Sequence, residues 1–434
     1  MITAVLDDDP TGTQAMANVP IVLDWSNGAV AAVVQPGDPS VHLLTNSRAH
    51  TASEAGAITA AAAAAARAAF GDARLLLRGD STLRGYVWEE YAAVREVISP
   101  AAPGVPLLLV PAFPAAGRIT IDGVHLLERD GKRVPLHRTE YAGDAHLSYG
   151  DARLARWADE RSGGRLAAVD AVEIALPRVR AADGVEVVAA AIRAVAGNGR
   201  PAVVVPDAET VADLEVIARG LRLAEVDTPV IARCAPAFAA IVTGTAATGL
   251  VDPPAADRGV LVLCGSFVPT TTAQLAELNR ARPGVTVFAD VRALAGEGGA
   301  GEVERLAAEA RRLLAEQGLA VVATPRERDP GLADAGSQQR IATALAAVAP
   351  LVAPAVVIAK GGITSAVTAR DGLGARTARV VGPVVTGVSL WRLPTGPAYL
   401  VVPGNVGGPR LLAELVTLLL PGSGRSRREP AGSA

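Results

Sequence analysis

Short apolar runs alternate with longer stretches rich in Ala, Leu, Arg and Glu along most of the chain. This alternation is typical of βαβ units, in which helices connect the strands of a mainly parallel sheet. The expected strands are Ile2–Leu6, Val41–Leu44, Arg74–Leu77, Pro106–Val110, Ala202–Val205, Gly259–Leu263, Val285–Phe288, Leu319–Ala323, Val356–Ala359 and Ala398–Val402. The expected helices include Ser53–Phe70, Val87–Ile98, Val303–Gln317 and Gln339–Val348.

The periodic pattern is interrupted between Gly249 and Gly259, where two prolines follow one another. A domain boundary there would divide the chain into parts of ordinary domain size. We therefore expect an N-terminal domain over residues 1–250 and a C-terminal domain over residues 259–420. Both belong to the α/β class, each with a mainly parallel sheet flanked by helices. Residues 421–434 are rich in Gly, Ser and Arg, and we expect a disordered tail.

Composition narrows the range of partners. Half of the 434 residues are hydrophobic, and the net charge is −3. Nucleic acids and anionic membranes both attract a strong basic excess, so we expect neither as a partner. Cys234 and Cys264 form no metal-binding motif, and we interpret them as buried thiols in a reducing compartment. No apolar run is long enough for a signal peptide or a membrane span, so the expected location is the cytoplasm.

Polar side chains follow four of the expected strands in the first half of the chain. In a parallel sheet the carboxyl ends of the strands share one edge, where ligands bind. Arginine binds a carboxylate through two parallel hydrogen bonds, and Asp, Ser and Thr can hold hydroxyl groups. A carboxylate beside one hydroxyl can also accept its proton. This combination suits a polyhydroxy acid. The segments are Asp7–Thr13, Thr45–Arg48, Arg78–Gly85 and Pro111–Arg118.

Each of these segments also has a purely structural interpretation. Asp7–Asp9 and Asp80–Thr82 are good helix N-caps, and Arg48 alone is typical of a solvated loop. The functional interpretation depends on their meeting at one sheet edge.

Glycine-rich turns follow three of the expected strands in the second half. Such turns let backbone N–H groups approach phosphate oxygens, which indicates a nucleotide site. Glycine can equally serve only to make tight turns. The segments are Cys264–Thr272, Lys360–Ala366 and Pro403–Gly408. The chain has no GxxxxGK[ST] motif, and the GxGxxG match at Gly296–Gly301 lies several residues past its strand, so we interpret it as a loop.

Together these motifs resemble the four-carbon acid sugar kinase family over nearly the whole chain. Asp8-Asp9-Pro10-Thr11-Gly12 is similar to the family's opening motif, and Asp80 to Gly85 match its central Asp-Ser-Thr-Leu-Arg-Gly motif without change. Pro111 to Arg118 and Gly123 to His125 match a third motif. The resemblance extends to the second-half loops at Gly265-Ser266, Gly361 to Ser365 and Gly404 to Gly407.

The resemblance implies an ATP-dependent kinase that acts on threonate, erythronate or 3-oxo-tetronate, with Mg²⁺ bridging the phosphates. It also implies a substrate domain and an ATP domain with the active site in the cleft between them. Asp80 is the expected catalytic base, and Asp8 is its alternative. The implied substrate residues are Asp8, Arg48, Asp80, Ser81, Thr82 and Arg84. The implied ATP residues are Ser266, Gly361, Gly362, Ile363, Thr364 and Gly404, with no protein ligands assigned to the metal.

Two departures from the family pattern concern specificity. The first motif reads Asp-Asp-Asp-Pro-Thr-Gly where many relatives have Asp-Asp-Leu-Thr-Gly, and Ile363 stands where many have Glu. A kinase for another small acidic polyol therefore remains an alternative, as do a sugar-acid dehydrogenase and a catalytically inactive sensor of the acid. The sequence determines neither the exact substrate nor the oligomeric state, and a homo-oligomer stays open.

Overall fold

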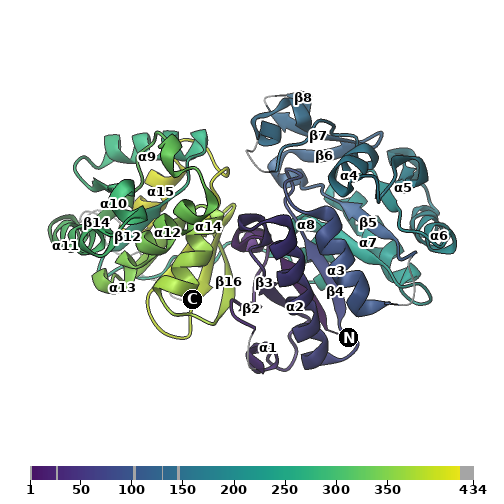
Figure 1. Cartoon of the computed structure of the whole chain (residues 1–434), viewed down its shortest axis with the longest axis horizontal. Helices are drawn as coiled ribbons and strands as arrows, with labels where there is room; N and C mark the ends of the chain where they lie inside the picture. The colour runs from purple at the N-terminus through teal and green to yellow at the C-terminus, as the bar shows by residue number, and fades with distance from the viewer. Residues whose placement is uncertain (1, 26–27, 101–103, 130, 144–146, 421–434) are drawn as a thin grey trace, which may run out of the picture. The chain divides into compact units, whose positions relative to one another are not determined.

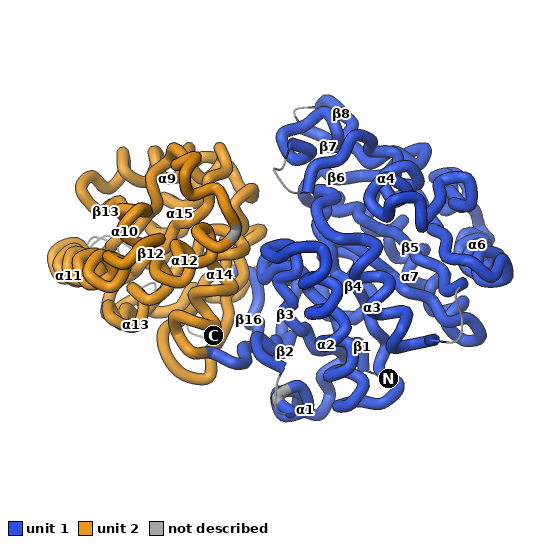
Figure 2. The backbone as a smooth tube through the Cα atoms, in the orientation of Figure 1, with its two compact units in different colours: residues 1–249, 375–383 blue, residues 250–374, 384–434 orange. Residues whose placement is uncertain are grey.

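The computed structural model describes residues 2–25, 28–100, 104–129, 131–143 and 147–420 (Figure 1). The chain forms two compact units (Figure 2). Unit 1 comprises residues 1–249 and 375–383, and unit 2 comprises residues 250–374 and 384–434. The expected disordered tail, residues 421–434, lies outside the described residues.

Unit 1 is built on a sheet in the order β16-β2-β3-β1-β4-β11-β5-β10-β9. All neighbouring strands are parallel except β16, which runs antiparallel to β2. The strands are β1 (Thr3–Asp7), β2 (Val19–Val22), β3 (Ser40–Leu44), β4 (Arg74–Arg78), β5 (Leu107–Val110), β9 (Val172–Ile174), β10 (Val203–Pro206), β11 (Ile231–Cys234) and β16 (Thr377–Val385).

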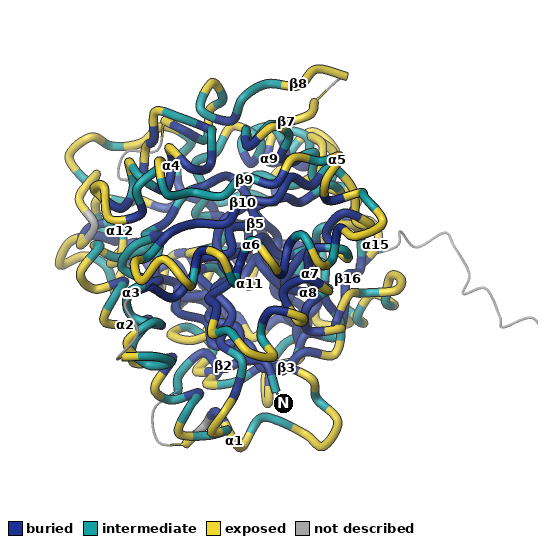
Figure 3. Tube along the Cα trace, turned by 90° about the vertical axis from the view of Figure 1, so that its right-hand side faces the viewer, coloured by how far each residue is buried: buried dark blue, intermediate teal, exposed yellow. Residues whose placement is uncertain are grey.

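Helices cover this sheet, and their ends follow from local sequence. Thr51 and Glu54 form a capping box at the start of α2, which satisfies two backbone N–H groups that the helix leaves unpaired. Small Ala side chains on α2 are fully buried, whereas the outer faces of the helices are exposed (Figure 3). The helices of unit 1 are α1 (Ala29–Val33), α2 (Ala52–Phe70), α3 (Val87–Ile98), α4 (Leu154–Ser162), α5 (Leu176–Val179), α6 (Gly184–Gly197), α7 (Val211–Ala224) and α8 (Pro236–Thr243).

A second, antiparallel sheet of unit 1 follows β5. It has the order β6-β7-β8 and was not expected from the sequence. In β7, intermediate and buried positions alternate from Val124 to Leu127, which is typical of an antiparallel strand with one covered face. The strands are β6 (Arg118–Ile121), β7 (Val124–Arg129) and β8 (Lys132–Pro135).

Unit 2 repeats the layered plan with a sheet in the order β13-β14-β12-β15-β18-β17. Its strands are parallel except β17, which is antiparallel to β18. The strands are β12 (Val260–Cys264), β13 (Thr286–Phe288), β14 (Leu319–Ala323), β15 (Val356–Lys360), β17 (Val388–Arg392) and β18 (Ala398–Val402). The helices are α9 (Pro269–Ala281), α10 (Val291–Ala295), α11 (Gly299–Gln317), α12 (Ala335–Ala346), α13 (Val348–Val352), α14 (Gly362–Val367) and α15 (Leu411–Leu419).

The α/β class and every expected strand are confirmed, and three details differ. Residues 375–383, expected in the C-terminal domain, belong to unit 1 because β16 pairs with β2. The strand β11 lies between β4 and β5, so the segment after β5 is not the neighbour of the segment after β4. The GxGxxG match is a loop only in part: residues 296–298 form the turn between α10 and α11, and Gly299 begins α11. No described helix combines the length and apolarity that crossing a membrane requires.

Candidate functional site

The turn after β1 separates the three consecutive aspartates by role. Asp9 caps a short 3-10 helix, and its carboxylate accepts a hydrogen bond from the Thr11 N–H at 2.7 Å. A β-carbon at Gly12 would lie 2.7 Å from Asp7 Oδ2, so only glycine lets this helix rest on the carboxylate. The N-cap interpretation therefore holds for Asp9, whereas Asp7 and Asp8 are buried and face arginines.

Arg78 links these two buried aspartates. It is the last residue of β4 and lies opposite Asp7 in the register of the sheet. Its Nη1 is 3.1 Å from Asp7 Oδ1 and 2.5 Å from Asp8 Oδ1. His42 adds a contact from β3, with its Nδ1 3.0 Å from Asp7 Oδ2. Burial opposes ionisation of Asp7, but Arg78 and His42 outweigh it and lower the pKa of this carboxyl.

Arg48 joins the loop after β3 to two other strand ends. Its Nε is 3.1 Å from Asp8 Oδ2, and its Nη2 is 2.5 Å from Asp9 Oδ2. Its Nη1 is 3.1 Å from Asp80 Oδ2. Only 11% of the Arg48 side chain is exposed, and the three carboxylates outweigh burial to raise its pKa. Arg48 is therefore a bridge between aspartates, not a solvated loop residue.

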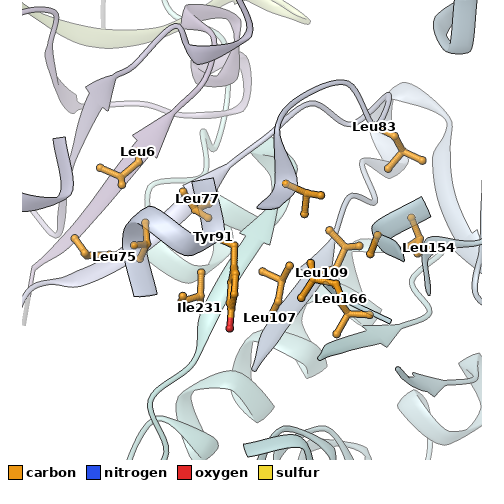
Figure 4. Close-up of a cluster of buried hydrophobic side chains, with 14 of the residues drawn as sticks. Leu6, Leu75, Leu77, Leu83, Tyr91, Leu107, Leu109, Leu154, Leu166 and Ile231 are labelled. Carbon is orange, nitrogen blue, oxygen red and sulfur yellow. The ribbon is translucent and has the colours of Figure 1, made fainter. Parts of the chain in front are cut away.

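The Asp80–Gly85 segment is a tight turn built around the Asp80 carboxylate. This carboxylate accepts hydrogen bonds from the Thr82 N–H at 3.1 Å, from the Thr82 hydroxyl and from Arg84 Nε at 2.6 Å. Leu83 has a left-handed backbone, with φ of 67°, and its side chain lies in the hydrophobic core with Leu109 and Leu154 (Figure 4). Burial of that side chain offsets the backbone strain and fixes the turn.

Two neighbours hold the backbone of the same turn. His125 Nε2 is 2.9 Å from the Ser81 carbonyl, and the Tyr149 hydroxyl donates to the Thr82 carbonyl at 2.9 Å. Thr120 contacts the other ring nitrogen of His125 at 3.0 Å. Burial lowers the pKa of His125 to about 4, so this histidine is neutral near pH 7 and its role is structural.

The carboxylates of this cluster differ in how strongly their surroundings favour the ionised form. Among the described residues the cluster includes four carboxylates and three guanidinium groups, namely Asp7, Asp8, Asp9, Asp80, Arg48, Arg78 and Arg84. Burial raises the pKa of Asp8 to about 7 against the attraction of Arg48 and Arg78. Arg84 and Arg48 outweigh burial at Asp80 and hold the pKa of that carboxyl well below its usual range. Asp8 is thus the carboxylate that changes protonation near neutral pH.

A second buried ion pair, which the sequence did not predict, lies beside this cluster. Arg233, from the unexpected strand β11, places its Nε 3.1 Å from Glu90 Oε2. Glu90 also accepts a hydrogen bond from Ser47 Oγ at 2.7 Å. A β-carbon at Gly79 would lie 2.5 Å from the Arg233 guanidinium, so this glycine is needed for packing. The signal in the sequence was an Arg within the short apolar run Ile231–Cys234.

Within the described residues, the segment after β5 forms no ion pair with the cluster. Arg118 begins β6, and its guanidinium lies 5.5 Å from the centre of the Tyr141 ring. This is a cation–π contact that supports the second sheet. Three of the four predicted strand ends therefore meet at one edge of unit 1.

In unit 2, three predicted loops meet around Ser266. A β-carbon at Gly404 would lie 2.7 Å from Ser266 Oγ, and one at Gly361 would lie 3.0 Å from Ser266 Cβ. A β-carbon at Gly265 would lie 2.6 Å from Thr364 Oγ1. Gly361 also has φ of 110°, a conformation that favours glycine. Small residues are thus required where these backbones converge.

Side chains from α9 hold the loop after β18 in place. The Thr271 hydroxyl donates to the Gly404 carbonyl at 3.1 Å, and Gln274 Nε2 donates to the Val406 carbonyl at 2.9 Å. From β15, Lys360 Nζ donates to the Pro403 carbonyl at 2.6 Å, and burial lowers the pKa of Lys360 to about 8. These bonds fix the loop before any ligand binds.

The remaining predicted nucleotide residues lie at the start of α14. Gly362 is the first residue of this helix, directly after Gly361. Ile363 is 47% exposed, which is unusual for a large apolar side chain and leaves it accessible to a ligand. The six predicted nucleotide residues therefore follow three strands of unit 2, with Ser266, Gly361 and Gly404 in loops and the other three in the first turn of α14.

The described residues contain no group of three or more His, Cys, Asp and Glu side chains placed to hold a metal ion. In unit 1 the clustered carboxylates already pair with arginines. In unit 2 the three glycine-rich segments contain hydroxyls but no carboxylates. This donor set fits a Mg²⁺ ion that keeps water ligands and is held mainly by phosphates.

Comparisons with known proteins agree with this division. Two solved structures share the fold. One is a Salmonella typhimurium LT2 protein provisionally named a tRNA synthase, with a TM-score of 0.69 and 20% identity, covering 95% of this chain and 98% of the other. The other is Haemophilus influenzae protein HI1011, of DUF1537, with a TM-score of 0.62 and 19% identity, covering 96% of this chain and 100% of the other. The sequence matches none of the curated proteins with which it was compared.

Two domain families match consecutive parts of the chain. Residues 261–412 match the family described as a nucleotide-binding C-terminal domain. Residues 3–242 match the family described as a sugar-binding N-terminal domain. The first match falls within unit 2 except for residues 375–383, and the second falls within unit 1. The chain therefore belongs to the family with this sugar-binding N-terminal domain, and it also carries the nucleotide-binding C-terminal domain.

Proposed function

We propose that this protein is an ATP-dependent kinase that phosphorylates a hydroxyl of a four-carbon sugar acid of the threonate, erythronate or 3-oxo-tetronate type. The observation that carries the proposal is the buried aspartate–arginine cluster in a unit that matches a sugar-binding domain, within a chain that also has a nucleotide-binding domain. Phosphoryl transfer needs a positioned hydroxyl, a carboxylate to orient it and a bound nucleotide.

The acidic group of the substrate requires a cation that the aspartates leave accessible. Arg84 is 24% exposed, against 11% for Arg48 and 3% for Arg78. We therefore assign the substrate carboxylate to Arg84, while Arg48 mainly holds the aspartates in place. The adjacent Ser81 and Thr82 belong to the same turn and are assigned to the sugar hydroxyls.

Asp8 is a better candidate than Asp80 for the catalytic base. A general base works best when its pKa lies near the working pH, and burial raises the pKa of Asp8 to about 7. Asp80 is strongly stabilised as an anion and is a weak proton acceptor. In the proposed step, Asp8 takes the hydroxyl proton while the substrate oxygen bonds to the γ-phosphorus. The bond between that phosphorus and the bridging oxygen breaks, and ADP leaves.

The nucleotide is assigned to the three glycine-rich loops of unit 2. We assign the backbone N–H groups near Ser266 and Gly404 to phosphate oxygens, because the glycines let these loops lie close together. The Gly361 N–H itself donates to the Val402 carbonyl, so Gly361 is assigned to the close approach of the loop. Residues Gly362, Ile363 and Thr364 complete the set. Mg²⁺, when bound with ATP, neutralises charge on the phosphates. The hydroxyls of these loops suit an ion that the phosphates and water mainly hold.

A thermal-shift screen of four- to six-carbon sugar acids, each with and without MgATP, tests the proposal. A ligand that binds only the folded protein raises its melting temperature. We expect ATP and a four-carbon acid each to raise it, and a coupled assay to detect ADP formation with that acid. Stabilisation by NAD but not ATP would indicate the dehydrogenase instead. Binding of both ligands with no ADP formed would indicate the sensor.

A further inference from the structure

An arginine that the motifs do not include lies beside the predicted nucleotide loops. Arg326 is in the loop after β14, which is the parallel neighbour of β12. The carboxyl ends of these strands share one sheet edge, so this loop lies next to the loop that contains Ser266. Arg326 Nη2 donates a hydrogen bond to the Ser266 carbonyl at 2.5 Å.

Two further contacts orient the Arg326 guanidinium. Its Nε is 3.2 Å from Thr272 Oγ1, and its central carbon is 5.7 Å from the centre of the Phe267 ring. These partners all come from the loop after β12 and the first turn of α9. These contacts with Ser266, Phe267 and Thr272 fix the plane of the Arg326 guanidinium.

The hydrogen bonding of Arg326 is incomplete. Within the described part of the chain, its buried Nη1 has no hydrogen-bond partner and no carboxylate forms an ion pair with it. A buried charged donor without an acceptor is unfavourable, and an anion removes that cost. Of the three arginines that are buried among the described residues, Arg78 and Arg233 pair with carboxylates, whereas Arg118 contacts the Tyr141 ring. The uncompensated charge of Arg326 therefore points to an anionic ligand.

The other cationic side chains at this sheet edge are less suited to bind an anionic ligand. Lys360 is fully buried, and its ammonium donates to the Pro403 carbonyl. Arg328 lies 5.0 Å from the centre of the same Phe267 ring, but it is exposed and no hydrogen bond orients it within the described residues. Arg326 alone combines a fixed guanidinium, an unsatisfied donor and direct contact with a predicted nucleotide residue.

We propose that Arg326 binds the phosphate chain of the nucleotide in unit 2. This assignment rests on the proposed nucleotide site and adds to it a cationic side chain that the glycine-rich motifs lack. Arginine's planar guanidinium can donate two parallel hydrogen bonds to phosphate oxygens. Such a charge-assisted hydrogen bond strengthens the binding of ligands that have phosphates and not of ligands that lack them. Arg326 should therefore distinguish ATP and ADP from adenosine.

Calorimetric titration of the full chain with ATP, ADP and adenosine tests the assignment. Arg326→Gln should weaken ATP and ADP binding by about 10- to 100-fold, the range expected for a charge-assisted hydrogen bond, and leave adenosine affinity unchanged. Arg328→Gln, the matched control on the same ring, should change ATP affinity less than about twofold. Thr272→Val keeps the charge but removes an orienting hydroxyl, and should weaken ATP by several-fold.

The outcomes separate this assignment from the proposed function. If Arg326→Gln loses affinity for ATP and adenosine equally, Arg326 has only a structural role. If Arg328→Gln loses as much ATP affinity as Arg326→Gln, the effect comes from surface charge in general and not from Arg326. If Arg326→Gln does not fold, the ATP affinities of Thr272→Val and Arg328→Gln are compared instead. Equal ATP affinity in these two variants overturns the assignment. Wild-type protein that binds none of the three ligands would overturn the proposed function and this assignment together.

Discussion

The two units use the same kind of mainly parallel sheet, but the residues at the edges that form the candidate sites have opposite character. In unit 1 the edge carries aspartates and arginines that pair with one another below the surface. In unit 2 the edge carries glycines and hydroxyls. The loops there lie so close together that a β-carbon on these glycines would clash with a neighbouring loop. One edge is organised by side-chain charge and the other by backbone geometry.

This difference matches the chemistry of the two proposed ligands. A sugar acid offers several hydroxyls and one carboxylate, which side chains of both signs can position. A nucleotide offers a phosphate chain, which backbone N–H groups bind when no side chain blocks them. Mutations should therefore act differently at the two edges: changes of charge should matter most in unit 1, whereas in unit 2 changes of volume at the glycines should matter as well as the charge of Arg326.

The largest expected effect is at Asp8. Asp8→Asn removes the proposed proton acceptor while keeping the size of the side chain, and should lower kcat by about 10²–10⁴-fold. The affinity for MgATP should stay near that of the wild type. Single-turnover kinetics at saturating ligands measures the effect. The isosteric control is Asp80→Asn, which should mainly raise KM for the sugar acid. The opposite ranking of the two variants would return the base to Asp80.

Arg78 should have the largest effect on stability. Arg78→Met leaves the buried Asp7 and Asp8 without their shared partner, and loss of one member of a buried pair costs about 3–5 kcal/mol. Urea unfolding of the full chain should show a clearly lower midpoint. Arg193→Met is the control, because Arg193 pairs with Asp227 at the surface, and its midpoint should hardly move. Similar midpoints for both variants would mean that the cluster does not stabilise unit 1.

Arg84 should affect the sugar acid but not the nucleotide. Arg84→Gln removes the accessible guanidinium, and the loss of a charge-assisted hydrogen bond should raise KM for the sugar acid by about 10- to 100-fold. Steady-state kinetics with each substrate varied in turn measures this, with KM for MgATP unchanged. Arg95→Gln, which removes an arginine paired with Glu96, serves as the control. A rise in KM for MgATP of the same size would contradict the assignment of Arg84 to the acid.

The smallest predicted effect concerns a single methyl group in unit 2. Gly404→Ala places a carbon 2.7 Å from Ser266 Oγ and should push the two loops apart, which lowers ATP affinity by roughly tenfold. Gly408→Ala is the matched control, since nothing lies within 4 Å of its added carbon. Calorimetry with ATP compares the two. An unchanged ATP affinity in Gly404→Ala would show that these loops do not need close approach.

The sequence predicted the strands and the polar segments well because both follow from local pattern. Apolar runs such as Val356–Ala359 are buried on both faces of a parallel sheet, so they are recognisable without knowing their neighbours. It did not predict β11, because that strand contains Arg233, whose burial depends on Glu90 from a distant helix. Nor did it predict that 375–383 joins unit 1, because pairing between distant segments leaves little local signal.

The candidate site shows the same limit. The sequence singled out Asp8, Arg48 and Asp80, and the structure brings them together through ion pairs. Which aspartate is the better base depends on burial and on how many arginines each one contacts, and these quantities exist only after folding. Arg326 was missed for a related reason, because its importance comes from contacts with the loop after a neighbouring strand.

The pH dependence of kcat/KM for the sugar acid tests the central assignment most directly, because it reports the protonation of the free enzyme. Asp8 must be ionised to accept a proton, and its pKa is raised to about 7, so activity should fall as the pH drops below about 7. This fall in kcat/KM at acidic pH should remain in Asp80→Asn and should shift to a different pH in Asp8→Glu. A kcat/KM that stays constant from about pH 5 to 8, or a limb that disappears in Asp80→Asn, would contradict the account.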